Sequence, residues 1–187
     1  MALVLDLVVT AVGFAVFGQH VWALRGHFAS DRMTGGARAI SAGALMACLI
    51  LLLLVWYGSQ PAGAQIAGVA VMIASLAVFW AAVRASREAK LRFAFDEALP
   101  QSLVVLGPYR FVRHPFYTSY LMFWAGWAAA TWSAWALAPV ILMAVMYTLA
   151  ARYEERLLGN SEMSAAYADY RQRVGMFWPK FRRPAIA

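Results

Sequence analysis

Charged side chains and cysteine are scarce in this chain of 187 residues. Asp, Glu, Lys and Arg together make up 13% of it, whereas 63% of its side chains are apolar. This balance lies far outside the average for soluble globular proteins, so we predict an integral membrane protein. The one cysteine, Cys48, cannot form an intrachain disulfide and is expected to pack as a small apolar group. No cysteine–histidine cluster has metal-ligand spacing, and we predict no metal site.

Linkers and repeats are missing as well. No Gly/Ser/Pro-rich linker, low-complexity tract or internal repeat divides the sequence, which predicts one membrane domain over residues 1–187. The chain does contain apolar runs close to the roughly 20 residues that cross a bilayer as a helix. They lie at residues 2–24, 40–57, 65–83, 116–131 and 134–151. We therefore expect an all-α integral membrane bundle of five transmembrane helices. The first run is not a convincing signal peptide, since its start carries Asp6 rather than Lys or Arg.

The basic residues predict the orientation of these helices. All 16 Lys and Arg residues fall in the loop after the first run, between the third and fourth runs, or after the fifth. The positive-inside rule then places the N-terminus outside and the C-terminus in the cytoplasm, in an inner or plasma membrane. Because these charges flank apolar runs, membrane topology explains the net charge of +7. We expect the lipid bilayer as a partner and no nucleic acid, and the oligomeric state stays open.

A further helix is expected after the fifth run. Met163, Tyr167, Tyr170 and Val174 recur there at helical spacing among polar neighbours. This pattern is typical of an amphipathic helix that lies along the membrane interface.

Other aromatic and polar residues suggest membrane anchoring. Gln19 and His20, beside Trp22 near the end of the first run, are expected at the membrane interface, with a role in substrate binding as the alternative. The tryptophans at positions 124, 127, 132 and 135 are expected to be lipid and interface anchors.

Residues 103–117 are the one stretch where turn-forming, cationic and aromatic residues crowd together. Gly107-Pro108 breaks any continuous helix, and Pro115 suits the first turn of a new one. Between these breaks lie Tyr109, Arg110, Arg113 and His114. Broken backbone at membrane depth is tolerated only where protein buries it or where it lines a cavity. We therefore predict a pocket at this stretch.

Two adjacent carboxylates, Glu154 and Glu155, follow the last apolar run, on the same predicted side as the broken stretch. Aromatic faces such as Tyr109 and Tyr117 stabilise a sulfonium by cation–π attraction of about 0.5–2 kcal/mol each. A carboxylate such as Glu154 can accept hydrogen bonds from a ribose or attract an ammonium group. This combination suits S-adenosylmethionine. Glu155 is expected to face water or pair with an arginine, and Arg110 to contact a lipid phosphate.

Several separated motifs carry a family resemblance. The string Leu-Val-x-x-Gly-Pro-Tyr-Arg-x-x-Arg-His-Pro-x-Tyr begins at Leu103, and Glu-Glu-x-x-Leu, Tyr-x-x-Tyr and a proline follow in order. Over residues 99–179 this pattern resembles the isoprenylcysteine carboxyl methyltransferase family and its relatives among integral membrane methyltransferases, the phospholipid methyltransferases included. The first three runs match only in hydropathy. The resemblance implies a helical scaffold over residues 1–98 and a cofactor-binding catalytic region over residues 99–183.

Carried over position by position, the resemblance implies a site for S-adenosylmethionine, with S-adenosylhomocysteine as the product. The residues expected to line it are Gln101, Leu103, Val104, Tyr109, His114, Pro115, Phe116, Tyr117 and Glu154. Gln101 stands where eukaryotic members carry a histidine, and its amide can keep one hydrogen bond but no charge. The substrate-facing arginine of those enzymes falls near Ala150 here. We expect Arg152, the nearest arginine, or Arg113 to orient an anionic acceptor.

The chain is thus expected to be an S-adenosylmethionine-dependent methyltransferase that acts on a lipophilic or lipidated acceptor at the cytoplasmic membrane face. Carboxyl methylation of an isoprenylcysteine-like substrate is the reaction that the resemblance implies first. Methylation of a phospholipid amine or of a small thiol are alternatives, and so is a non-catalytic accessory membrane protein that retains the fold. A transport role is disfavoured, because no charged residue lies near the middle of any run.

Overall fold

The structure, a computed structural model, describes residues 2–26, 33–87, 96 and 102–180. This described part is built from helices and contains no β-strand, which confirms the predicted all-α class. The α-helices are α1 (Ala2–Gly26), α2 (Gly35–Tyr57), α3 (Ala62–Ala85), α4 (Pro115–Thr131), α5 (Leu137–Gly159) and α6 (Ser164–Arg173). Two short 3-10 helices, η2 (Gly107–Arg110) and η3 (Ala134–Ala136), precede α4 and α5.

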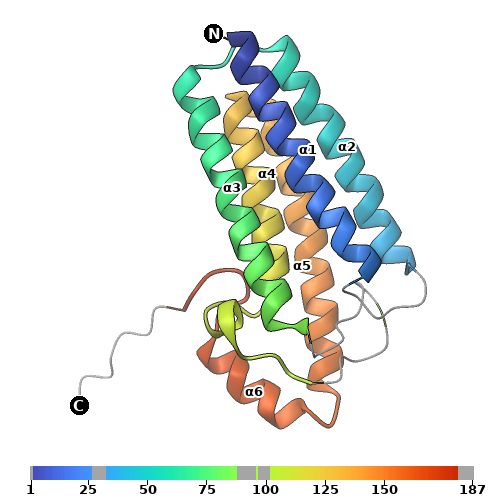
Figure 1. The fold of residues 1–187 in the computed structure, drawn as a ribbon. Coiled ribbons are helices and arrows are strands. Elements are labelled where there is room, and N and C mark those ends of the chain that lie inside the picture. The colour runs from blue at the N-terminus through green and yellow to red at the C-terminus, as the bar shows by residue number, and fades with distance from the viewer. Residues whose placement is uncertain (1, 27–32, 88–95, 97–101, 181–187) are drawn as a thin grey trace.

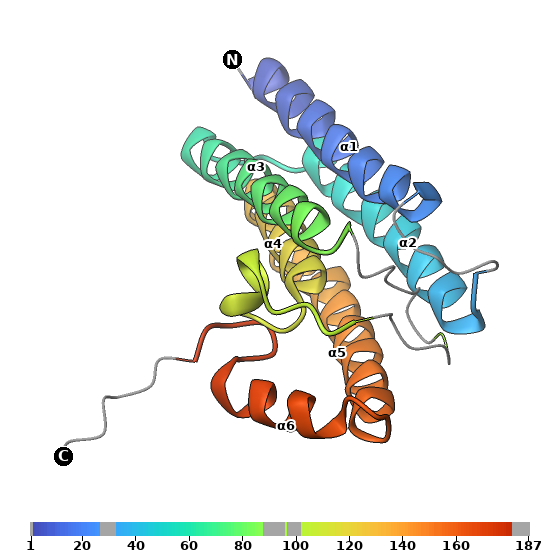
Figure 2. The same ribbon diagram turned by 60° about the horizontal axis from the view of Figure 1, so that its bottom comes forward.

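Helices α1 to α5 run alongside one another as an elongated bundle, and α6 lies across one end of it (Figure 1). The N-terminus lies at the opposite end. Turning the molecule brings the α6 end forward and shows η2 beside the segment that follows α6 (Figure 2). The segments that carry the predicted site residues therefore lie together at one end of the bundle.

Helices α3 and α4 pack backbone against backbone. A Cβ atom on Gly68 would overlap the carbonyl oxygen of Gly126, and one on Gly126 would lie 2.9 Å from the carbonyl oxygen of Gly68. Small residues that let two backbones approach are typical of helix pairs in membranes. This contact fixes α4 against α3, and α4 begins next to the candidate site.

Four helical segments are long and apolar enough to cross a membrane. They are Ala2–Trp22, Gly35–Tyr57, Ala62–Ala85 and Ala134–Gly159. These segments support a multi-pass membrane protein. Helix α4 has 17 residues, which is the short end of the range for a spanning helix. The count of five spans, and the orientation derived from it, therefore stay predictions.

The interior of the bundle contains two tryptophans that were predicted to lie at its surface. Trp124 and Trp127 on α4 are 2% and 0% exposed, so their prediction as lipid anchors is wrong. The physical reason is that α4 contacts α1, α2, α3 and α5, which leaves this face of α4 no access to lipid. Trp132 and Trp135, in the turn before α5, are exposed, as an anchor requires.

His20 also lies inside the bundle rather than at the interface. Its ring contacts the rings of Phe79, Tyr120 and Phe123 at centroid distances of 4.8, 4.6 and 5.4 Å, and the residue is buried. The predicted interfacial placement is wrong because α3 and α4 cover this face of α1. The prediction for Cys48 is confirmed, since its side chain is buried among apolar neighbours.

A helix does follow α5 in the described part of the chain. Two tyrosines of α6, Tyr167 and Tyr170, are buried together with Val174, and Leu103 and Leu158 pack against them. The apolar side of α6 thus contacts the protein itself. The position of α6 relative to a membrane stays a prediction.

Candidate active site

The break predicted at Gly107-Pro108 is the 3-10 turn η2. Gly107 has a φ of +57°, the left-handed region that favours glycine, and a Cβ atom there would lie 3.0 Å from the Cβ of Ala85. The carbonyl of Pro108 accepts hydrogen bonds from the backbone N–H groups of Phe111 and Val112 at 3.0 and 3.1 Å. The turn packs on α3 and leads the chain into α4.

Residues 174–178, which we call the C-terminal strap, lie alongside the chain just before α4. The backbone N–H groups of Arg113 and His114 donate to the carbonyls of Gly175 and Met176 at 2.8 and 3.1 Å. A Cβ atom on Gly175 would overlap the carbonyl oxygen of Trp178, so the strap requires glycine there. These bonds hold the backbone of the His-Pro motif in place.

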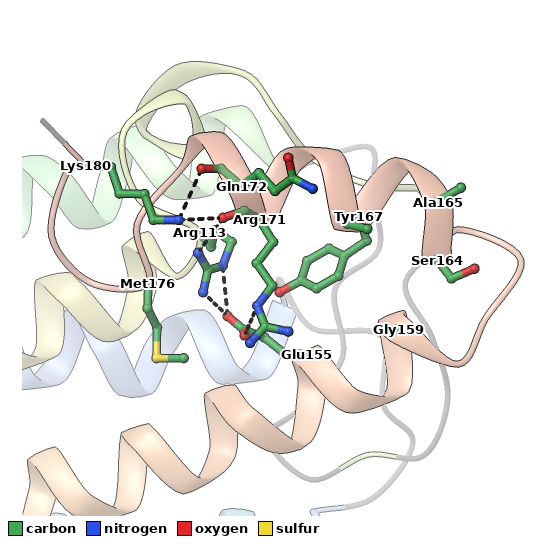
Figure 3. A pocket seen from close by; sticks show the side chains of 11 residues that line it. Arg113, Glu155, Gly159, Ser164, Ala165, Tyr167, Arg171, Gln172, Met176 and Lys180 are labelled. Carbon is green, nitrogen blue, oxygen red and sulfur yellow. Dashed lines mark hydrogen bonds and ion pairs between the residues drawn. The ribbon is translucent and has the colours of Figure 1, made fainter. Parts of the chain in front are cut away.

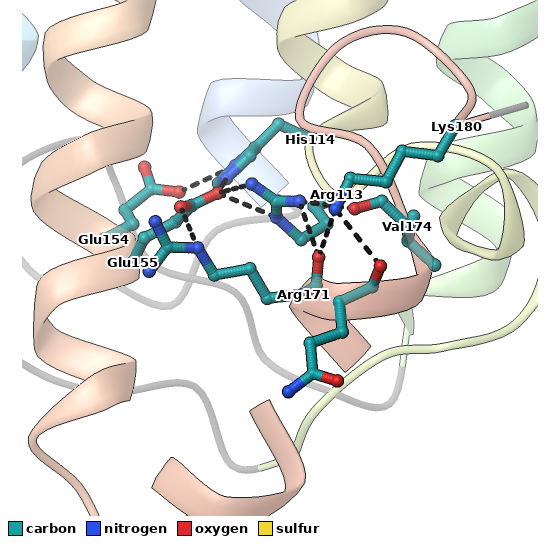
Figure 4. A network of polar contacts seen from close by, with 8 residues as sticks. Arg113, His114, Glu154, Glu155, Arg171, Val174 and Lys180 are labelled. Carbon is teal, nitrogen blue, oxygen red and sulfur yellow. Dashed lines mark hydrogen bonds and ion pairs between the residues drawn. The ribbon is translucent and has the colours of Figure 1, made fainter. Parts of the chain in front are cut away.

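Arg113 and Glu155 form a buried ion pair between this segment and α5 (Figure 4). Both side chains are 6% exposed. Nε and Nη2 of Arg113 lie 2.9 and 2.8 Å from Oε1 of Glu155, and Nη1 donates to the carbonyl of Val174. A buried charge needs such partners, since an unpaired one is strongly destabilising. The expectation that Glu155 pairs with an arginine is confirmed.

His114 joins the two adjacent glutamates of α5. Its Nε2 lies 3.1 Å from Oε1 of Glu155 and its Nδ1 lies 3.5 Å from Oε2 of Glu154. Pro115 occupies the first position of α4, as the sequence predicts. The histidine is therefore the link between the buried Arg113–Glu155 pair and the more exposed Glu154.

The surroundings of His114 favour its charged form. Burial alone would lower the pKa of His114, because burial penalises the imidazolium. Hydrogen bonds to Glu154 and Glu155, together with their negative charges, prevail and raise the pKa of His114 above its ordinary value of 6.5. An imidazolium can donate from both ring nitrogens, which matches the two carboxylates.

Tyr117 and Glu154 bring an aromatic surface and a carboxylate together. The Tyr117 hydroxyl donates a hydrogen bond to Oε1 of Glu154. The Tyr117 ring stacks on His114 and on Tyr147, with centroid distances of 5.7 and 5.4 Å and interplanar angles of 19° and 16°. The Glu154 side chain is 31% exposed, so its carboxylate remains accessible.

Tyr147 is a residue of the site that was not predicted. Its ring continues the stack beyond Tyr117, and its hydroxyl accepts a hydrogen bond from Nε1 of Trp124 at 3.1 Å. Tyr147 lies seven residues, about two helical turns, before Glu154 on α5. That spacing puts both residues on one face of the helix and could have identified the tyrosine.

The other predicted site residues occupy different surroundings. Tyr109 and Phe116 belong to a buried cluster around Phe79, with Val104 packed against it. Leu103 packs instead against the buried tyrosines of α6. Arg152 is exposed on α5, and Gln101 lies outside the described residues. The structure thus brings His114, Pro115, Tyr117 and Glu154 together, with Arg113 and Glu155 beside them.

A comparison with models of protein families identifies the family to which the chain belongs. The model of the phospholipid methyltransferase family matches residues 63–161, which is more than half of the sequence. The chain belongs to this family. Neither the curated proteins nor the solved structures gave a match. This family is part of the superfamily of isoprenylcysteine carboxyl methyltransferase-like membrane enzymes, so the resemblance seen in the motifs is confirmed.

The family match includes the residues of the candidate site. It spans nearly all of α3 and the whole of η2, α4, η3 and α5, and so covers both the His-Pro motif and the Glu154–Glu155 pair. Together with the apolar helices, it identifies a membrane methyltransferase of the multi-pass type. In the described part of the chain no group of three His, Cys, Asp or Glu side chains could hold a metal ion.

The donor set at this end of the bundle fits S-adenosylmethionine. The accessible carboxylate of Glu154 can accept hydrogen bonds from hydroxyl or ammonium groups. The stacked rings of His114, Tyr117 and Tyr147 lie beside it. The faces of the two tyrosines attract cations such as a sulfonium.

Proposed function

We propose that the chain is an S-adenosylmethionine-dependent methyltransferase whose cofactor site is built around Glu154, Tyr117 and His114. The observation that supports this proposal most strongly is the bond between Tyr117 and Glu154. These residues are 37 positions apart, and both were expected at the site from the motifs alone. When bound, the cofactor supplies an electrophilic methyl group carried by a sulfonium.

The residues of the chain would act mainly by positioning. Glu154 would accept hydrogen bonds from the polar groups of the cofactor, while the stacked rings of Tyr117 and Tyr147 would lie beside its cationic centre. The ion pair of Arg113 and Glu155 holds His114, and with it the start of α4, in a fixed place. In-line displacement at a methyl carbon needs alignment of the reacting atoms and exclusion of water.

A phospholipid amine is the acceptor that we favour. An isoprenylcysteine carboxylate would need a cationic side chain to orient it. Arg113 makes its contacts within the protein, and Arg152 is exposed on α5. The family match points to phospholipids instead. An amine that gains a methyl group must lose a proton, and the accessible carboxylate of Glu154 is a base at the site that could take it.

Cofactor binding tests the proposal directly. We expect calorimetric titration of the detergent-purified chain with S-adenosylhomocysteine to show binding that weakens by about 10- to 100-fold in Glu154→Gln, because a hydrogen bond to a charged group contributes about 1.5–3 kcal/mol. Glu162→Gln is the matched control, since Glu162 is exposed in the turn after α5. Unchanged affinity in a well-folded Glu154→Gln variant would contradict the assignment.

Labelled S-adenosylmethionine identifies the acceptor. Membrane lipids incubated with the enzyme and a methyl-labelled cofactor should yield label in phospholipid headgroups that mild base does not release as methanol. Release as methanol would indicate a carboxyl ester, and a volatile labelled sulfide would indicate a thiol acceptor. Cofactor binding without any labelled product would favour a non-catalytic accessory protein.

A further inference from the structure

An open cavity lies on the α6 side of the Arg113–Glu155 ion pair (Figure 3). It has a volume of about 940 Å³, is open to the surface, and is bordered by the end of α5, by α6, and by Met176 of the strap and Lys180 after it. The side chains that matter for its chemistry are Arg113, Glu155, Tyr167, Arg171, Gln172 and Lys180. The predicted cofactor residues His114, Tyr117 and Glu154 are not among those that line it.

The charge of this cavity is positive. Three of its lining side chains are cationic and one, Glu155, is a carboxylate. Glu155 is already neutralised, since it lies within 3.1 Å of both Arg113 and His114. The cations Arg171 and Lys180 therefore determine the charge that a ligand would meet.

Arg171 and Lys180 are placed to receive an anion. Nε of Arg171 comes only within 3.8 Å of Oε2 of Glu155, and its side chain is 64% exposed. The ammonium of Lys180 donates to the backbone carbonyls of Arg171 and Gln172 at 2.8 and 3.2 Å, which fixes it at the C-terminal end of α6. Both side chains keep N–H donors for a further partner, because a guanidinium has five and an ammonium three.

Tyr167 supplies a polar group that lacks a partner. The residue is 4% exposed, lines the cavity and points its ring toward Arg171 and Glu155 (Figure 3). Its hydroxyl lies near the side chains of Glu155 and Arg113, but within the described part of the chain it makes no hydrogen bond of ordinary geometry. A buried hydroxyl without a partner costs about 1–3 kcal/mol, so such groups usually have a ligand or water beside them.

We propose that this cavity binds a phosphate group through Arg171, Lys180 and the hydroxyl of Tyr167. A phosphate offers several acceptor oxygens and negative charge, which matches a guanidinium, an ammonium and a phenolic donor. An anionic phospholipid headgroup and a free phosphate share this chemistry. The site is separate from the cofactor site proposed above, and it does not depend on methyl transfer.

Titration with short-chain lipids tests the phosphate site. We expect the detergent-purified full-length chain, without cofactor, to bind dihexanoyl phosphatidylglycerol in calorimetry. Arg171→Gln should weaken this binding about tenfold, and Tyr167→Phe by a few fold, because each removes a donor to the phosphate. Glu154→Gln should leave it unchanged, which separates this site from the cofactor site.

Arg173→Gln is the matched control. Arg173 lies on the same helix and is 56% exposed, but it pairs with Asp169 and does not line the cavity. Equal losses in Arg171→Gln and Arg173→Gln, with thermal stability preserved in both, would indicate diffuse surface charge and overturn the proposal. Absence of binding to the wild-type chain would also overturn it.

Inorganic phosphate distinguishes the two sources of the ligand. Weak competition by inorganic phosphate would support a lipid headgroup as the natural occupant. Binding of inorganic phosphate that matches the lipid in affinity, with the same loss in Arg171→Gln, would support the phosphate site and assign it to a soluble phosphate.

Discussion

Arg113 is held by the protein on three sides of its guanidinium. Two of its nitrogens lie against Glu155, and the third donates to the backbone carbonyl of Val174 in the C-terminal strap. Its side chain thus ties α5, the strap and the start of α4 to one another. This geometry favours a positioning role for Arg113 over contact with a substrate.

His114 gives the site a predictable response to pH. Its pKa is raised in the folded protein above the 6.5 of an ordinary histidine, through Glu154 and Glu155. The stabilisation from its charged form is therefore fully present below pH 6.5 and is lost as the pH rises through the raised pKa. We expect the melting temperature of the wild type in detergent to fall between pH 6 and pH 9, and to fall less in His114→Gln.

The variant should also be less stable at pH 6. Loss of hydrogen bonds to charged groups costs about 1.5–3 kcal/mol, and this difference should shrink toward pH 9. Thermal unfolding followed by tryptophan fluorescence at both pH values measures it. Parallel pH curves for the wild type and His114→Gln would show that the carboxylates do not hold the histidine in its charged form.

At the scale of single residues, the motifs predicted the part of the site that depends on local spacing. Tyr117 and Glu154 were expected at the site and lie in contact. Trp124 and His20 were assigned wrongly, because an amphipathic ring suits the membrane interface and the interior of the bundle equally well. Only the packing of α4 among its neighbours decides between the two.

At the scale of elements, the C-terminal strap holds the entry to α4 by main-chain hydrogen bonds. Arg113 and His114 donate from the backbone, and the Thr118 hydroxyl donates to the carbonyl of Phe177 at 3.1 Å. This pairing could not be predicted, because hydrogen bonds between backbones more than 50 residues apart leave no pattern in the side chains. The helix break at Gly107-Pro108 was predictable, because it is local.

Gly175 is the position at which the strap can be tested. In Gly175→Ala the new methyl group would overlap the carbonyl oxygen of Trp178, so the strap must move away from its position beside Arg113. We expect a loss of about 1–3 kcal/mol in stability and weaker binding of S-adenosylhomocysteine, since His114 loses its backbone support. Thermal melting and calorimetry measure the two effects.

Gly159→Ala provides the comparison for that experiment. A Cβ atom on Gly159, the last residue of α5, would meet no atom within 4 Å. This variant should change stability by no more than about 0.5 kcal/mol and leave cofactor affinity intact. If Gly175→Ala behaved in the same way, the strap would not support the site.

At the scale of the whole molecule, polar contacts occur at both ends of the bundle but differ in kind. The end that carries the N-terminus has a hydrogen bond of 2.6 Å from the Gln65 amide to Asp6, between α3 and α1. The other end carries the ion cluster of Arg113, His114 and the two glutamates. A bundle with its cationic residues at one end suits a membrane in which that end faces the cytoplasm.

The orientation of the chain in the membrane can be measured with single cysteines introduced into a Cys48→Ala background. If α4 crosses the membrane as a fifth span, Ser59 in the turn between α2 and α3 lies outside, and Glu162 after α5 lies in the cytoplasm. In spheroplasts, a membrane-impermeant maleimide should then label Ser59→Cys at once and Glu162→Cys only after permeabilisation. Labelling of both Ser59→Cys and Glu162→Cys in intact spheroplasts would mean an even number of crossings between the two positions. Since α3 and α5 each have the length of a full span, α4 would then be the helix that fails to cross.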